Sequence, residues 1–193
     1  MAATGRDVAV LWHEPSESTA DLCRLETWGT GRRLSGSVLT VRDGVPWEGR
    51  YIVECDSAWR TRRVHVEARS AGGESTQLEL LANGEGRWRR APGEPILDDG
   101  SVIDVDLRLT PATNTLPIRR LGLRVGESGS TRALWIGFPG LEIEPSMQTY
   151  SRLAARRWRY ASGDFSAELE VDEHGLVVRY GDFWREVARW HRR

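Results

Sequence analysis

The sequence predicts a mostly β protein: a single-domain antiparallel sheet curled into a closed or partly open barrel, with a short helix at the C-terminus. Apolar and polar residues alternate with a period of two along most of the chain, which is the pattern of half-buried strands. Turn residues separate these segments at short intervals, and no long helical period competes with them. Many short strands in one domain expose fewer free edges when the sheet closes or nearly closes.

Composition limits the classes of protein to consider. A chain of 193 residues can bury a core without disulfides or metals, so we expect one domain covering residues 1–193. The net charge of -1 provides no global attraction to nucleic acid or to an anionic membrane. Every basic residue apart from histidine is arginine, which favours bidentate contacts to carboxylate and phosphate. Cys23 and Cys55 form no CxxC or zinc motif, so we expect buried free thiols.

The first half of the chain is expected to consist of strands joined by polar turns. The expected segments are 8–12, 22–28, 34–41, 47–55, 59–69, 77–81 and a strand around Trp88. Asp43-Gly44 is a strong hairpin signal. In the fifth segment, alternation places Val64, Val66 and Ala68 in an inward row. Extending that row backwards places Arg60 and Arg62 at its end, at the mouth of the expected barrel.

The second half continues the pattern and ends differently. The expected extended segments are 133–138, 141–150, 158–161, 165–171 and 176–180. The tail from Asp182 shows helical spacing, with Trp184, Val187, Ala188 and His191 on one face. We therefore expect one short C-terminal helix.

The stretch 104–121 is predicted to be a strand, a tight corner and a second strand. Asp104 and Asp106 share one face of the first strand. Pro111 and Pro117 bracket the Thr-Asn-Thr corner, and each proline restricts its own φ and its predecessor. In the second strand, Arg119 would begin an apolar inward row and would need a carboxylate or a ligand anion.

At these residues the chain resembles a bacterial family labelled putative glycolipid-binding, a domain of unknown function. The similar motifs are DVDLRLTPATNTLPIRRLGL from Asp104, QTY at 148–150 and FSAELEVDEHGLVVRYGDF from Phe165 to Phe183. Their spacing agrees from about Trp12 to Phe183, which is nearly the whole chain. The resemblance implies a mostly antiparallel β fold with a ligand-sized concavity and no established catalytic residues. It also adds Gln148 and Tyr150 as candidate binding residues.

Motifs for common chemistry are absent from the sequence. Gly29-Thr30-Gly31 lacks the third glycine of a dinucleotide fingerprint, and a chain without lysine has no Walker lysine. Gly126-Glu127-Ser128-Gly129 fails the nucleophile-elbow spacing by one position. The four histidines show no zinc spacing. We therefore predict no cofactor, no metal and no assigned catalytic residue.

The candidate ligand-binding residues are Arg60, Arg62, Asp104, Asp106, Thr113, Asn114, Arg119, Gln148 and Tyr150. Each kind of residue could instead have a purely structural role. The two carboxylates could pair with nearby arginines, and Arg119 could be such a partner. The corner side chains could cap their own turn. Trp59, Trp88, Trp135, Trp158, Tyr150 and Tyr160 could form a stacking wall or belong to the core.

The functional hypothesis is non-catalytic binding of a small amphiphilic ligand, such as a glycolipid or lipid-like metabolite, in a concavity of the sheet. A hydrolase or isomerase using Asp104 or Asp106 is the alternative from another class. A structural or partner-binding module with a filled interior is a further alternative, and single-stranded nucleic acid is disfavoured by the net charge. The segment 8–11 is too short for a signal-peptide core and no apolar run could span a membrane, so we expect a cytoplasmic protein.

Overall fold

The computed structural model describes residues 7–192, so the ends of the predicted domain, residues 1–6 and 193, lie outside the described part. The strands are β1 (Val8–Glu14), β2 (Thr19–Trp28), β3 (Gly31–Arg42), β4 (Val45–Cys55), β5 (Thr61–Ser70), β6 (Ser75–Ala82), β7 (Arg87–Arg90), β8 (Pro95–Asp98), β9 (Val102–Leu107), β10 (Ser128–Ile136), β11 (Ile143–Arg152), β12 (Arg157–Ser162), β13 (Phe165–Val171), β14 (Val177–Tyr180) and β15 (Trp184–His191). A 3-10 turn, η1 (Ala112–Asn114), leads into the helix α1 (Thr115–Leu121).

All the strands belong to one 15-stranded sheet, in the order β8-β7-β6-β5-β4-β3-β2-β1-β15-β14-β13-β12-β11-β10-β9. Neighbouring strands are antiparallel except β9 and β10, which run parallel. Strands β1 and β15 pair, so the first and last strands lie in the middle of the sheet. The outermost strands β8 and β9 are not hydrogen-bonded to each other, so the predicted barrel is partly open.

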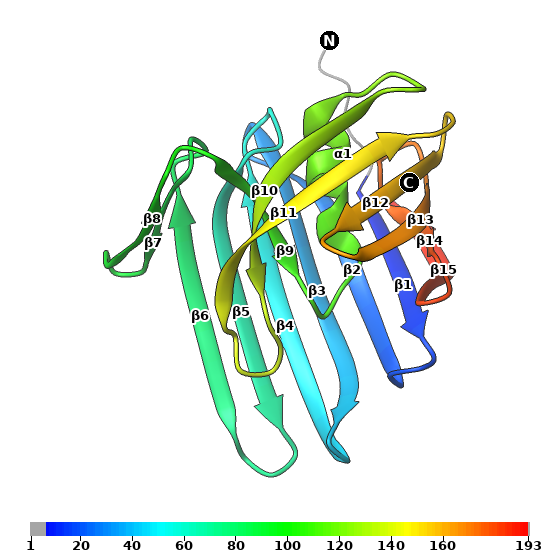
Figure 1. The fold of residues 1–193 in the computed structure, drawn as a ribbon. Helices are drawn as coiled ribbons and strands as arrows, with labels where there is room; N and C mark the ends of the chain where they lie inside the picture. The colour runs from blue at the N-terminus through cyan, green and yellow to red at the C-terminus, as the bar shows by residue number, and fades with distance from the viewer. Residues whose placement is uncertain (1–6, 193) are drawn as a thin grey trace.

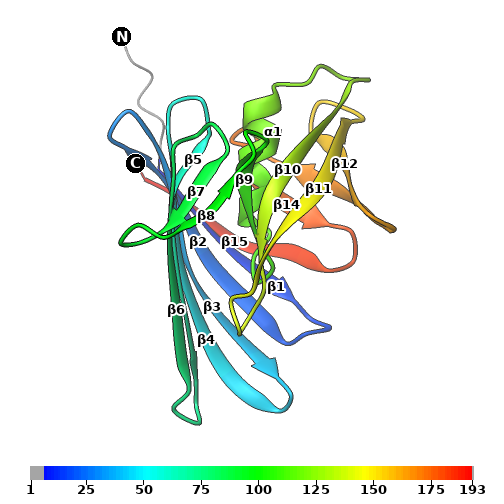
Figure 2. The same cartoon turned by 60° about the vertical axis from the view of Figure 1, so that its left-hand side comes forward.

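The sheet has two walls that face each other with α1 between them. Strands β2–β6 form one wall and β9–β12 cross in front of it (Figures 1 and 2). One hydrophobic cluster includes residues of both walls. At Gly49 the walls approach so closely that an added Cβ would lie 2.6 Å from Cδ1 of Leu109 and 3.0 Å from Cε2 of Phe138. The apolar space between the walls is therefore largely packed.

The alternation predicted from the sequence is present in the strands. Val64, Val66 and Ala68 of β5 are completely buried, as the inward row required. The Asp43-Gly44 hairpin is also confirmed, with Arg42 opposite Val45. Both turn residues have positive φ (52° and 77°), which matches the right-handed twist of a hairpin. Cys23 and Cys55 are buried and free.

The second strand predicted for the stretch 104–121 is wrong, because η1 and α1 follow β9. Pro117 lies in the first turn of α1, where its missing N–H costs no helical hydrogen bond. Leu116 and Ile118 are buried, so tertiary packing favours the helix. Gly122 ends it in the left-handed conformation (φ 58°).

The predicted C-terminal helix is also wrong. Residues Trp184–His191 form β15, which pairs with β1 and β14. Of the proposed apolar face, Trp184 is buried, whereas Val187 is 62% exposed. Pairing with the otherwise free edge of β1 satisfies backbone groups along the whole segment, which a short surface helix would not do.

Across the described residues 7–192, no helix has both the length and the apolar character needed to cross a membrane.

Candidate functional site

A pocket of about 440 Å³ opens at the end of the barrel where the β1–β2, β12–β13 and β14–β15 turns lie. We call it the aromatic pocket. Its aromatic side chains are Trp135, Tyr160, Phe165, Tyr180, Phe183 and Trp184. Its polar side chains include Glu14, Asp106, Thr110 and Asn114. The pocket is therefore amphipathic.

The rings contact one another in tilted or edge-on geometry. The Tyr160 ring centroid lies 6.0 Å from that of Phe165 and 6.0 Å from that of Tyr180. Phe165 and Phe183 lie 5.6 Å apart and are 42% and 43% exposed, so they form the mouth. Edge-on contacts stabilise aromatic clusters beyond simple burial, so these four rings form one connected part of the pocket wall.

The inner end of the pocket is a hydrogen-bonded network. Asp106 Oδ2 accepts from Nε2 of Gln148 at 2.6 Å, and Oδ1 lies 3.4 Å from the hydroxyl of Thr113. The Tyr150 hydroxyl donates to Asn114 Oδ1 at 3.0 Å and lies 3.3 Å from Gln148 Oε1. Asp106 and Asn114 line the pocket while the other three support them from behind. The acceptor atoms therefore have a fixed geometry.

Asp106 is a carboxylate at the inner end of this pocket that accepts hydrogen bonds from neutral side chains alone. Burial raises its pKa to about 6, partly offset by the hydrogen bonds from Gln148 and Thr113. It makes no ion pair within residues 7–192. In contrast, Glu14 accepts backbone N–H groups of its own turn, and Glu17 pairs with Arg42 and Arg108. A ligand that donates hydrogen bonds would match Asp106 best.

The structure brings together five of the residues singled out from the sequence: Asp106, Thr113, Asn114, Gln148 and Tyr150. Their contact with a ligand remains a prediction. The expectation that corner side chains bond locally also holds in part, because Asn114 Nδ2 donates to the carbonyl of Pro111 at 3.1 Å.

Asp104 lies outside the pocket, although it shares a strand face with Asp106. It is fully buried and accepts two hydrogen bonds from Arg120, from Nε at 3.0 Å and from the terminal nitrogen at 2.6 Å. The Thr131 hydroxyl adds a third at 2.8 Å. The expected arginine partner exists, but it is Arg120 and not Arg119, because α1 turns Arg120 towards β9.

Arg60 and Arg62 do not continue the inward row. Both are exposed, and Arg62 contacts the carbonyl of Asn83 and lies 3.9 Å from Asp56. A register shift at Glu54/Cys55 places Thr61 opposite Cys55, and Thr61 is fully buried. This irregularity reverses the alternation before Arg63 and turns the arginines outwards.

Arg119 is at the opposite end of the barrel from the aromatic pocket. It lies in the last turn of α1 and not in a strand, and its guanidinium donates to the carbonyl of Glu173 at 3.2 Å. The predicted inward row of this arginine is therefore wrong, and Val125 of that row is 58% exposed.

The sequence reasoning missed most of the aromatic wall. Phe165, Tyr180, Phe183 and Trp184 line the pocket but were not among the candidates, whereas Trp88 is a core residue whose indole donates to the carbonyl of Val102 at 2.7 Å. The sequence did contain one signal for the four missed residues. They lie next to hairpin turns, a position that places a side chain at the rim of the sheet.

A second buried network behind the pocket was also missed. Asp21 is fully buried and accepts from the hydroxyls of Thr110 at 2.5 Å and Tyr51 at 2.9 Å. Its Oδ1 has no partner within the described residues. Burial raises its pKa to about 7, against the opposing effect of the two hydroxyls. Because Thr110 also lines the pocket, this network is connected to its wall.

Among residues 7–192 there is no cluster of three side chains suited to holding a metal.

Comparison with known proteins gives a family and a fold. A family described as putative glycolipid-binding matches residues 9–186. The chain is similar to the crystal structure of a DUF1089 family protein from Pseudomonas aeruginosa, with 32% identity and a TM-score of 0.79, covering 90% of this chain and 94% of that one. It also shares its fold with a beta-barrel-like protein of domain of unknown function DUF1849 from Brucella abortus, at 8% identity, a TM-score of 0.55 and coverage of 97% and 98%. No curated protein matches significantly.

Proposed function

Since the chain belongs to the family described as putative glycolipid-binding, we propose that it binds a small amphiphilic molecule, such as a glycolipid or lipid-like metabolite, in the aromatic pocket without transforming it. The single observation that carries this proposal is the combination of an aromatic wall with a preorganised polar end in one pocket of about 440 Å³. Such volumes are in the range of small-molecule sites.

The two ends of the pocket suit the two parts of an amphiphile. Phe165 and Phe183 are exposed at the mouth, where rings cover an acyl chain or stack on the apolar face of a sugar. Asp106 and Asn114 present acceptors at the inner end. Hydroxyl groups donate to such acceptors, whereas an anionic head group would meet an uncompensated carboxylate. The proposal therefore favours an uncharged, hydroxylated head group.

Titration with dodecyl maltoside tests this proposal. Below its micelle concentration this detergent is expected to bind saturably, as measured by native mass spectrometry and by the change in tryptophan fluorescence. Phe183→Ala should weaken binding, whereas Trp190→Ala, an exposed residue on β15 away from the pocket, should not. Absence of saturable binding, or equal loss in both variants, would count against the proposal.

A second candidate is a hydrolase or isomerase with Asp106 as the acid or base. The observation in its favour is the pKa of about 6, which suits proton transfer near neutral pH. Asp104 does not share this role, since Arg120 and Thr131 occupy its oxygens. Activity screening of wild type and Asp106→Asn distinguishes the two, because an enzyme loses its turnover in the variant, whereas a binding protein shows turnover in neither form and only binds its ligand more weakly in the variant.

The proposal also covers the filled-interior alternative, the kind of partner and the cellular location. The space between the walls is largely packed, as the filled-interior alternative expects, and the combination of aromatic and polar side chains in the aromatic pocket is what favours ligand binding over it. We propose a small amphiphile and not nucleic acid as the partner, and cytoplasmic residence. Cell fractionation with an antibody against the chain tests the location.

A further inference from the structure

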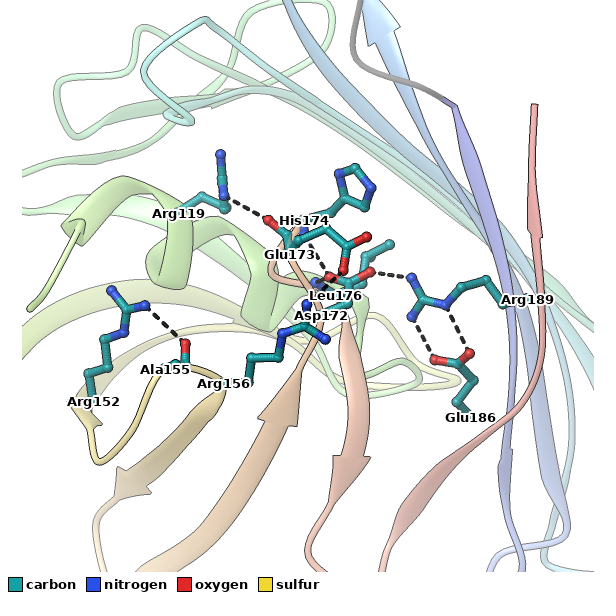
Figure 3. A network of polar contacts seen from close by, with 10 residues as sticks. All are labelled: Arg119, Arg152, Ala155, Arg156, Asp172, Glu173, His174, Leu176, Glu186 and Arg189. Atoms are coloured by element: carbon teal, nitrogen blue, oxygen red, sulfur yellow. Dashed lines mark hydrogen bonds and ion pairs between the residues drawn. The ribbon is translucent and has the colours of Figure 1, made fainter. Parts of the chain in front are cut away.

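A second depression, of about 420 Å³, lies at the other end of the barrel, and we call it the arginine pocket. It is bordered by the end of α1, the β11–β12 loop and the β13–β14 turn. Arg119, Arg152 and Arg156 line it (Figure 3). Asp172 and Glu173 are its acidic residues. Internal contacts neutralise some of these charges and leave others uncompensated.

Arg152 is held in place without a carboxylate. Its terminal nitrogens donate to the carbonyls of Leu123 at 2.8 Å and Ala155 at 2.9 Å. Its Nε is buried and has no acceptor within residues 7–192. The guanidinium lies 5.4 Å from the centre of the Trp158 ring. Two carbonyl dipoles and a ring fix its position but leave its charge uncompensated.

Arg119 is likewise fixed by groups that carry no net charge. It donates to the Glu173 carbonyl and lies 5.5 Å from the centre of the Trp59 ring. Its stem crosses Gly175, where an added Cβ would lie 2.9 Å from Cδ of Arg119. Within the described part of the chain, neither Arg119 nor Arg152 forms an ion pair with a carboxylate. Both guanidinium groups therefore keep a net positive charge beside the pocket.

The acidic residues do not compensate these charges. Asp172 is buried, caps its own turn by accepting from the N–H groups of His174 and Leu176 at 2.8 Å each, and pairs with Arg189. The Glu173 carboxylate is 3.4 Å from Arg156, with 60% of its side chain exposed. Its pKa is lowered by a backbone hydrogen bond first and then by the positive field of His174, Arg156 and Arg189. The pocket thus has an excess of positive charge.

We propose that the arginine pocket binds a phosphate-type oxyanion through Arg152 and Arg156, with the loosely held Glu173 carboxylate displaced from Arg156 when the anion binds. Arg119, whose guanidinium lies over Trp59 at the border of the pocket, adds positive charge to the site. Planar guanidinium groups match the oxygens of phosphate in bidentate fashion. Free phosphate and the head group of a phospholipid share this chemistry. The site is separate from the aromatic pocket and does not depend on the function proposed there.

Titration with inorganic phosphate and pyrophosphate tests the site, with backbone amide NMR shifts as the readout and ionic strength held constant with chloride. The wild type should show saturable shifts at Glu173 to Leu176. Arg119→Gln combined with Arg156→Gln should weaken binding at least tenfold. Glu173→Gln should strengthen it. The matched control is Arg159→Gln, which removes an arginine of β12 that lies 3.9 Å from Glu168. If the double variant fails to fold, Arg156→Gln alone is the test, because its side chain is 67% exposed.

Vesicles of phosphatidylcholine with and without phosphatidic acid separate the two sources of phosphate. Co-sedimentation that requires phosphatidic acid and is lost in the arginine variants supports a lipid head group. Saturable binding of free phosphate without co-sedimentation supports a soluble anion. Failure of both probes to bind, or equal binding by the arginine variants and Arg159→Gln, would overturn the proposal.

Discussion

The two ends of the barrel present opposite chemistry on the same sheet. At one end, six aromatic side chains line a pocket with Asp106, a carboxylate that forms no ion pair among residues 7–192. At the other end, Arg119 and Arg152 form no ion pair with a carboxylate of the same described residues. Strand β13 connects them, since Phe165 begins it at the aromatic pocket and the turn that follows Val171 borders the arginine pocket. Charges that could neutralise each other are kept apart by the length of a strand.

Asp104 shows what happens when a charge on the same strand face does find its partner. It lies two residues before Asp106, is buried, and is neutralised by Arg120. An ion pair that is complete within the protein is costly to break, because the remaining charge is left buried without a partner. A charge that has no internal partner is available for a ligand.

Asp104→Ala should lower the free energy of unfolding by about 3–5 kcal/mol, because Arg120 and Thr131 would lose their acceptor in the interior. Urea denaturation measures the change. Asp182→Ala is the control, since Asp182 pairs with Arg179 at 2.9 Å with 87% of its side chain exposed, and its loss should cost less than about 1 kcal/mol. Similar losses in both variants would show that the buried pair is not a stabilising unit.

Asp21→Asn should change the pH dependence of stability. The folded-state pKa of about 7 lies above the ordinary value of 3.8, so the folded state retains a proton that the unfolded state has lost between these values. Stability from this group is therefore complete below pH 4 and decreases as pH rises to 7. Relative to wild type, the variant should gain on the order of 1 kcal/mol per pH unit across this range. Parallel stability curves for the two proteins would contradict the assignment.

Gly175→Ala should lower the free energy of unfolding of the protein by about 1–2 kcal/mol, because φ is +85° and the new Cβ would collide with Arg119. The same collision should weaken phosphate binding at the arginine pocket. Gly163→Ala is a matched control at the other end of β13. Its φ is +54° and nothing lies within 4 Å of an added Cβ, so it has backbone strain without the collision. Thermal unfolding and phosphate titration together separate the two contributions.

Binding of an uncharged, hydroxylated amphiphile should weaken as pH falls through the Asp106 pKa of about 6. The carboxylate accepts hydrogen bonds best when ionised, so affinity for dodecyl maltoside should fall about tenfold between pH 7.5 and 5. Titrations at several pH values measure the effect. In Asp106→Asn the affinity should be lower and independent of pH across this range, and a pH dependence that survives the substitution would implicate another group.

Local patterns in the sequence were sufficient to predict most of the strands. The row of Val64, Val66 and Ala68 and the Asp43-Gly44 hairpin depend on side-chain periodicity and turn conformation, which neighbouring residues determine. Where this reasoning failed, distant contacts had overridden it. The segment around Leu116 became helical against the core, and the segment around Val187 became a strand because β1 needed a partner.

The sequence by itself determined a β protein with alternating faces. Its nine candidate residues included Asp106 and Asn114, and the family resemblance added Gln148 and Tyr150. Only the tertiary structure decided that Arg120 neutralises Asp104, that Arg119 lies at the far end, and that Phe165 and Phe183 meet at a pocket mouth. The reason is physical: alternation specifies the side of a strand, but which charge meets which partner depends on α1, on the register shift before Arg63, and on strands far apart in the chain.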